Sequence, residues 1–250
     1  MSAELDFYFD PVCPFAWMTS KWVRLVADEK AMEVGWRFIS LRLLNADKDY
    51  ATHFPAGYEE GHTTGLRLLR VAAAVREAHG GQAVGRYYRA CGEAIFDREP
   101  GAQAAAQRDL GGFARAVLDG VGLDRACADA LDDAGRDGVI QAETDRALEL
   151  AGRDVGTPIL HFGPPEGAAF FGPVISRLPS PADAVRLWDH VSGLAGFAGF
   201  AELKRSLREV PQLRAFGIGD GRTGRQEDWS QGRRAAAVPG AAGDRSPRAT

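Results

Sequence analysis

A single cysteine at a predicted junction between a strand and a helix is the residue of this chain best placed to do chemistry. Cys13 stands in the segment FDPVCP, residues 9–14. Pro14 suits the first position of a helix, where its missing N–H is no loss, so we expect Cys13 to be the N-cap. Unpaired amides and the helix dipole favour a thiolate there, and such thiols titrate at about 3.5 to 7.5 rather than near about 8.5. The position therefore predicts a nucleophile at neutral pH, although a free cysteine can also be a small buried apolar residue.

The elements around Cys13 follow from the spacing of apolar residues. Residues 5–9 alternate between apolar and polar, the spacing becomes helical from Phe15, and residues 33–39 alternate again. Residues 4–40 are therefore predicted to form a strand–helix–strand unit, most simply a right-handed βαβ. The polar residues 47–58 that follow, with Pro55 and Gly57, indicate a loop.

The middle of the chain shows only helical periodicity, from about residue 63 to 152, with glycine-rich breaks that divide it into four or five helices. Strand patterns return at 159–162 and 168–171, separated by a Gly-Pro-Pro turn, which predicts a β-hairpin. A helix from Ser180 and a last helix over 197–207 are expected to follow.

These patterns predict an α/β domain formed by residues 4–45 and 153–215 and interrupted by a helical domain at 55–150. Residues 217–250 are rich in Gly, Ala, Arg and Pro and have one aromatic residue, Trp229. Such a composition does not bury enough apolar surface to offset the entropy of ordering, so we expect a disordered tail.

Composition excludes several classes of partner. The chain has 250 residues and a net charge of −4, and thus no overall basic field to attract nucleic acid. Neither a leader segment nor an apolar run of membrane-spanning length is present, so we expect a cytoplasmic protein without membrane contact. The other two cysteines, Cys91 and Cys127, do not form a Cys-x-x-Cys pair, and we expect both to be core residues and no metal to bind. His62, His79 and His161 have no evident catalytic partner, and only His161 is kept as a secondary candidate.

Beyond single residues, a Cys-Pro after the first strand, the helical insertion and the VGTP segment at 155–158 together resemble the DsbA-like branch of the thioredoxin superfamily. The segments FDPVCP, DVGTP at 154–158, FFGPV at 170–174 and ELKR at 202–205 are similar to the actinobacterial mycothiol-dependent nitroreductases of that branch. The resemblance implies a thioredoxin-like α/β fold with a large helical insertion. It also implies a cis peptide bond before Pro158, which would lie beside Cys13, with backbone groups of Thr157 offered to a substrate.

The same resemblance suggests a binding region around the sulfur. Its residues are Pro14, Phe15 and Trp17, where the two aromatic rings would form an apolar wall, together with Thr157, Pro158 and the polar side chains of Asn45 and Tyr58. It implies no tightly bound cofactor. A low-molecular-weight thiol, similar to mycothiol, would be the cosubstrate, and the partner would be a small electrophile or a mixed disulfide.

One position departs from the family pattern of Cys-Pro-Trp-Cys, because Ala16 replaces the second cysteine. Without that thiol, Cys13 has no partner for a disulfide across the first helical turn, and chemistry of the dithiol type is not expected. A route that uses one protein thiol and a second small thiol remains open.

Two alternatives stay open at this stage. The first strand of this chain is similar to that of kappa-class glutathione transferases and 2-hydroxychromene-2-carboxylate isomerases, which share the fold that the resemblance implies. These enzymes typically carry serine at the position of Cys13, where it activates a bound thiol. A binding protein that has lost turnover together with the second cysteine is the other alternative. The sequence gives no indication of oligomeric state.

Overall fold

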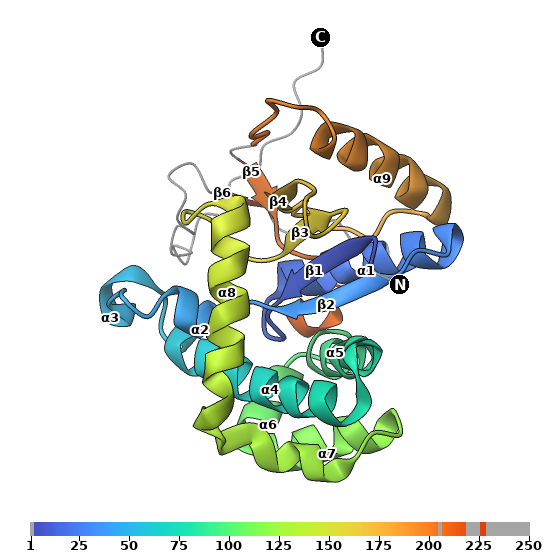
Figure 1. Cartoon of the computed structure of the whole chain (residues 1–250). Helices are drawn as coiled ribbons and strands as arrows, with labels where there is room; N and C mark the ends of the chain where they lie inside the picture. The colour runs from blue at the N-terminus through green and yellow to red at the C-terminus, as the bar shows by residue number, and fades with distance from the viewer. Residues whose placement is uncertain (1–2, 205–206, 219–225, 229–250) are drawn as a thin grey trace.

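A four-stranded mixed sheet carries the N-terminal cysteine loop. The computed structural model describes residues 3–204, 207–218 and 226–228 (Figure 1). The strands are β1 (Leu5–Phe9), β2 (Val34–Phe38), β3 (Ile159–Phe162) and β4 (Ala169–Phe171), in the spatial order β2-β1-β3-β4. β1 is parallel to β2 and antiparallel to β3, which in turn is antiparallel to β4. This topology confirms the predicted βαβ unit, the hairpin and the thioredoxin-like α/β fold.

The helices fall into two groups along the chain. α1 (Pro14–Lys30) connects β1 to β2, and α9 (Pro181–Ala195) follows the hairpin. The helices between β2 and β3 are α2 (Leu41–Leu44), α3 (Tyr50–His53), α4 (Tyr58–His79), α5 (Gly81–Phe96), α6 (Ala102–Arg108), α7 (Leu110–Gly120) and α8 (Asp137–Ala151), with 3-10 turns η1 (Arg125–Asp132) and η2 (Ala134–Arg136). α3 lies within the segment that the sequence predicted as loop.

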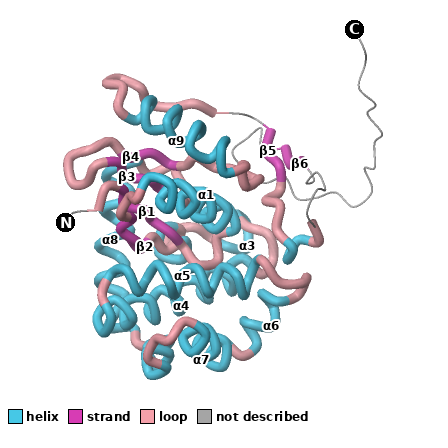
Figure 2. Tube along the Cα trace, turned by 90° about the vertical axis from the view of Figure 1, so that its right-hand side faces the viewer, coloured by secondary structure: helices cyan, strands magenta, loops and turns pink. Residues whose placement is uncertain are grey.

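The sheet separates two layers of helices because successive strand residues face opposite sides. Leu5, Phe7 and Phe9 point to the large core that also holds α1, whereas Tyr8 packs in a smaller cluster with Ala147 of α8. In Figures 1 and 2, α8 runs along one side of the sheet, and α1 with α9 lies on the other.

The sheet and the helices inserted after β2 share one continuous core. The ring of Tyr88 in α5 stacks on Phe9 of β1 with centroids 3.9 Å apart and lies 5.7 Å from Trp36 of β2. Trp17 of α1 meets Tyr88 edge-on at 5.9 Å. These aromatic contacts hold α5 against both the first strand and the helix that Cys13 begins.

The C-terminal region differs from the prediction. Residues 197–204 are not helical, although their apolar residues have helical spacing, and Phe197 and Leu203 are 70% and 82% exposed. Gly199 has a φ of +87°, a conformation that a helix does not contain, so the chain leaves the helical path there.

β5 (Leu207–Glu209) follows and pairs antiparallel with β6 (Gln226–Asp228), and η3 (Arg214–Phe216) lies between them in sequence. β6 falls within the predicted disordered tail, so that prediction is wrong for residues 226–228, where backbone pairing supplies order that the composition does not indicate. The other residues of the tail, apart from 217–218, lie outside the described residues. Among the described helices, none is long and apolar enough to cross a membrane.

The close packing of α5 on Trp17 yields a test of the fold. A Cβ atom added to Gly92 would overlap the indole ring of Trp17, whereas one added to Gly193 in α9 would meet nothing within 4 Å. Gly92→Ala should therefore reduce the free energy of unfolding by about 1–3 kcal/mol. Gly193→Ala should raise it by about 0.5–1 kcal/mol because alanine favours the helix. Urea unfolding followed by circular dichroism measures both, and equal effects of the two variants would contradict this packing.

Candidate active site

Cys13 is the N-cap of α1, as the sequence predicted. Its backbone is extended, with φ −85° and ψ 113°, and its Sγ accepts a hydrogen bond from the Ala16 amide at 3.4 Å. The same sulfur donates to the carbonyl oxygen of Thr157 at 3.4 Å. With 7% of its surface exposed, the thiol is enclosed between the first turn of α1 and a loop 144 residues further along the chain.

The Thr157–Pro158 loop is fixed to the sheet from both sides. The Thr157 hydroxyl donates to the carbonyl oxygen of Tyr8 at 3.2 Å, and the Gly172 amide donates to the carbonyl oxygen of Pro158 at 2.9 Å. The Thr157–Pro158 peptide bond is cis, the isomer that the resemblance implied. Strands β1 and β4 therefore hold the backbone of Thr157 against the sulfur.

The ionisation of Cys13 differs from the prediction. Burial raises the pKa of the thiol to about 12, because the thiolate loses its hydration, and the nearby negative charge of Asp10 adds to this effect. The hydrogen bond from the Ala16 amide lowers the pKa, as an N-cap should, but by less than burial raises it. The helix N-terminus was visible in the sequence, and the resemblance placed the Thr157–Pro158 loop beside Cys13, but neither indicated that the sulfur would be buried. A thiol with this pKa is protonated at neutral pH.

Asp10 is a functional candidate that the sequence analysis did not identify. Its side chain is fully buried and accepts the amide of Val12 at 3.0 Å and the amide of Leu41 at 2.8 Å. Burial raises the pKa of this carboxyl to about 7, and the two amides lower it by less. An aspartate three residues before the cysteine was the only sequence signal, and its burial depends on α2 and α4.

The residues that follow Cys13 have different environments. Pro14 and Phe15 are partly exposed at the start of α1, and both flank the sulfur in sequence. Trp17 is 1% exposed, and its Nε1 donates to Asp97 at 3.2 Å. The structure therefore places Trp17 in the interface with α5 and does not bring it to a substrate-facing wall, because the glycine at 92 lets α5 cover the ring.

Asn45 and Tyr58 are both held by local contacts. Asn45 is 4% exposed, donates from Nδ2 to the Leu41 carbonyl at 2.8 Å and accepts at Oδ1 from Lys48 at 2.8 Å. It closes the end of α2. Tyr58 is partly exposed, and its ring stacks on Phe54 at 5.9 Å. Among the described residues, no hydrogen bond joins Asn45 to Cys13.

His62 forms the centre of the aromatic cluster that contains Tyr58. Its ring lies edge-on to Tyr50, Phe54 and Tyr58, and its Nδ1 is 2.9 Å from the Tyr50 hydroxyl. Burial and the charge of Arg42 lower the pKa of His62 to about 4, so the ring is neutral at physiological pH. This cluster fixes the segment between α2 and α4.

The other two cysteines and His161 are buried in the fold. Cys91 is fully buried and Cys127 is 7% exposed, as expected for core residues. His161 is 2% exposed, and its Nε2 lies 3.0 Å from the carbonyl oxygen of Gly167 within the hairpin. Across residues 3–204, 207–218 and 226–228, no group of three His, Cys, Asp or Glu side chains is arranged to hold a metal.

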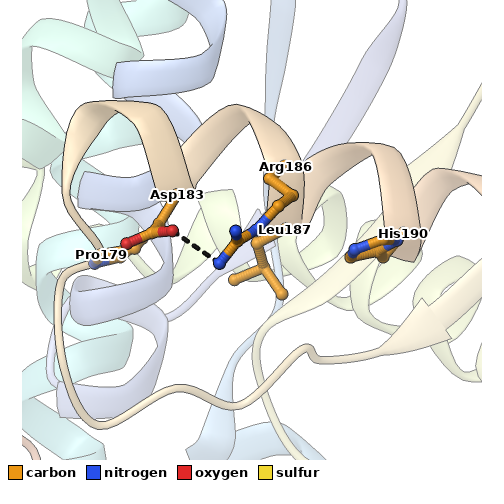
Figure 3. Close-up of a pocket in the computed structure, with 5 residues that line it drawn as sticks. All are labelled: Pro179, Asp183, Arg186, Leu187 and His190. Atoms are coloured by element: carbon orange, nitrogen blue, oxygen red, sulfur yellow. Dashed lines mark ion pairs between the residues drawn. The ribbon is translucent and has the colours of Figure 1, made fainter.

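An open pocket on the outer side of α9 contains none of the predicted site residues. Figure 3 shows its lining, which consists of Pro179, Asp183, Arg186, Leu187 and His190, with an ion pair of 2.7 Å between Asp183 and Arg186. These are side chains along one helix face and lack an unpaired buried group, so we assign the pocket no function.

The pKa of Cys13 can be tested through protein stability. Since the folded thiol titrates near 12 and a free cysteine near about 8.5, ionisation favours the unfolded chain between these values. The wild type should therefore lose up to about 1.4 kcal/mol per pH unit relative to Cys13→Ser between about pH 9 and 10. Urea unfolding of both proteins across this range measures the difference. A wild type that instead gains stability over Cys13→Ser as the pH rises toward about 8 would show that the cysteine is a stabilised thiolate, as its N-cap position alone suggested.

Comparison with known proteins places this geometry in a family. Residues 12–205 match the family model described as Rv2466c-like, mycothiol-dependent nitroreductase Rv2466c. The chain is 32% identical over 206 residues to the uncharacterized protein Rv2286c of Mycobacterium tuberculosis. The aligned region covers 80% of this chain and 81% of that protein.

Similar solved structures include the cytosolic disulfide reductase DsbM from Pseudomonas aeruginosa, with 14% identity, a TM-score of 0.48 and coverage of 76% of this chain and 99% of that one. A 2-hydroxychromene-2-carboxylate isomerase matches with 20% identity, a TM-score of 0.46 and coverage of 76% and 94%. The family model covers most of the chain, including Cys13 and the Thr157–Pro158 loop, and the chain therefore belongs to the Rv2466c-like family of mycothiol-dependent nitroreductases.

Proposed function

We propose that this protein is a thiol-dependent oxidoreductase that uses Cys13 as its one catalytic sulfur and a low-molecular-weight thiol, similar to mycothiol, as reductant. The observation that carries the proposal is the contact between the Cys13 sulfur and the Thr157 carbonyl, which places a backbone acceptor directly beside the nucleophile. A substrate that donates a hydrogen bond to this carbonyl would be oriented next to the sulfur.

The chemistry needs only one protein thiol. With a mixed disulfide as substrate, the Cys13 thiolate attacks one sulfur, forms a new disulfide with it, and expels the other half as a thiolate that takes up a proton. A small thiol then attacks the Cys13 disulfide, is itself joined to the bound half, and releases Cys13. With an electrophilic substrate, the Cys13 thiolate adds to the substrate, and a small thiol attacks the Cys13 sulfur and expels the substrate, which leaves with two added electrons and takes up two protons. A second small thiol attacks the resulting mixed disulfide, forms a disulfide with the first small thiol and releases Cys13.

The closed site explains how the thiol is protected between turnovers. The sulfur is protonated while its S–H donates to Thr157, and a thiol is a far weaker nucleophile than a thiolate. A ligand that takes over the Thr157 carbonyl frees the S–H, and solvent or the ligand can then accept the proton. Substrate binding and activation of the nucleophile are thereby linked through one carbonyl oxygen.

Ala16 determines the type of mechanism. Its amide donates to the Cys13 sulfur, and its methyl group is fully buried. The position that bears the second thiol in the family pattern is thus occupied by an inert group, so release of Cys13 depends on a thiol from solution. The cytoplasmic location, the absence of a tightly bound cofactor and the small partners remain predictions from the sequence.

Cys13→Ser tests the proposed role of the sulfur. Serine is a good N-cap, so α1 should be retained, whereas thiol-dependent reduction should fall to the background rate because a hydroxyl cannot form the disulfide intermediate. The assay follows consumption of a nitroaromatic compound or a mixed disulfide with mycothiol present. Retained turnover would instead favour an enzyme of the transferase or isomerase type, in which the residue only activates a bound thiol.

Ala16→Cys provides the complementary variant. The introduced thiol lies one helical turn from Cys13, and attack within the protein replaces attack by a second small thiol. The variant should form a disulfide between residues 13 and 16 and depend less on thiol concentration. Unchanged thiol dependence, together with detection of that disulfide, would contradict the proposed release step.

A further inference from the structure

Two buried aspartates, Asp6 in β1 and Asp10 in the loop that follows it, differ in the partners of their carboxylates. Asp6 is 5% exposed, and its Oδ1 pairs with the Arg37 guanidinium at 3.0 Å. Asp10 is 0% exposed, and no ion pair to it is found among the described residues. A buried carboxylate without a cation is costly, and the hydrogen bonds from two backbone amides offset part of this cost for Asp10.

The two carboxylate oxygens of Asp10 join the cysteine loop to the start of α2. One accepts the amide of Val12, which precedes Cys13, and the other accepts the amide of Leu41 at the start of α2. Gly65 of α4 packs directly on the carboxylate, where any larger residue would overlap it. The Cys13 amide also donates to the Asp10 carbonyl at 3.1 Å. The position of the nucleophile thus depends on Asp10 through both its backbone and its side chain.

We infer that Asp10 is a positioning residue that controls the ionisation of Cys13: its carboxylate holds the loop that carries the sulfur and, when charged, opposes formation of the thiolate. The catalytic meaning of this control rests on the proposed function, but the control itself does not. Asp10 acts through the loop and its charge, and no contact of its carboxylate with the sulfur is required.

The other titratable groups near Asp10 do not change charge at neutral pH. Tyr88 of α5 and Tyr50 of α3 both interact with the Asp10 charge, and burial raises the pKa of each hydroxyl. α4 contributes Gly65 at this point, and α2 contributes the Leu41 amide. Asp10 and Cys13 therefore remain as one coupled pair whose two negative charges repel each other.

This coupling has a characteristic pH dependence. Below about pH 6 Asp10 carries a proton, since burial raises its pKa to about 7, and thiolate formation is opposed by burial alone. Above about pH 8 the charge of Asp10 opposes it as well. The thiolate population of the wild type should therefore rise less steeply with pH across neutrality than that of a protein with a neutral residue at position 10.

The test is the rate of alkylation of Cys13 by iodoacetamide between about pH 5.5 and 9, resolved by peptide mass spectrometry. The proteins are the wild type, Asp10→Asn and the matched control Asp6→Asn. For Asp10→Asn, the rate relative to wild type should be near one at the lowest pH and at least about threefold at the highest, which corresponds to about half a pKa unit. For Asp6→Asn, the ratio should show no such rise, because its carboxylate is already neutralised by Arg37.

A ratio that stays the same at every pH would overturn the inference, because a purely structural role scales the rate uniformly. Asparagine accepts only one of the two amides, so circular dichroism must show that Asp10→Asn is folded. If it is not, the wild type decides alone: the logarithm of its rate must rise less steeply near pH 7 than on either side, and a constant slope would exclude the coupling. Alkylation needs no turnover, so these outcomes are independent of whether the enzyme reduces any substrate.

Discussion

The enclosure of one sulfur between a helix N-terminus and a loop from the other half of the chain is the constraint on which the site depends. The Ala16 amide and the Thr157 carbonyl both contact the Cys13 sulfur. The amide donates a hydrogen bond and stabilises the thiolate, whereas the carbonyl accepts one and stabilises the thiol. Burial decides between them and favours the thiol. The same enclosure that suppresses ionisation places the Thr157 carbonyl, our proposed substrate contact, beside the sulfur. In this proposal, protection of the thiol and recognition of the substrate have one structural cause.

The surrounding fold serves this enclosure. β1 ends at the cysteine loop, and β3 begins at the Thr157–Pro158 loop, so antiparallel pairing of these two strands brings both segments to one edge of the sheet. α5 then fixes α1 through Trp17 and Tyr88, and Asp10 fixes the loop before Cys13 to α2. Movement of the inserted helices relative to the sheet would therefore act on the sulfur through Asp10.

The sequence predicted those features that depend on local pattern. Apolar periodicity located β1, α1 and the hairpin, and Pro14 indicated the N-cap. It did not predict the pKa of Cys13, because neither the local pattern nor the resemblance, which placed the Thr157–Pro158 loop beside Cys13, shows how completely the sulfur is buried. It likewise placed Trp17 at the substrate, since nothing near residue 17 shows that Gly92 allows α5 to cover the ring. The helix expected at 197–207 is absent over the described residues 197–204, because Gly199 adopts a positive φ and Phe197 has no surface to pack against and remains exposed.

The most direct test of Cys13 as the one catalytic sulfur is the mass of the protein after incubation with the disulfide form of mycothiol, followed by peptide mapping. The proposed mechanism predicts one added thiol per chain, attached to Cys13 and released by free mycothiol. Cys91 and Cys127 should stay unmodified because they lie inside α5 and η1 and not at a helix N-terminus beside the Thr157–Pro158 loop. A disulfide between Cys13 and either of these cysteines, or no adduct on Cys13, would contradict a mechanism based on one protein sulfur.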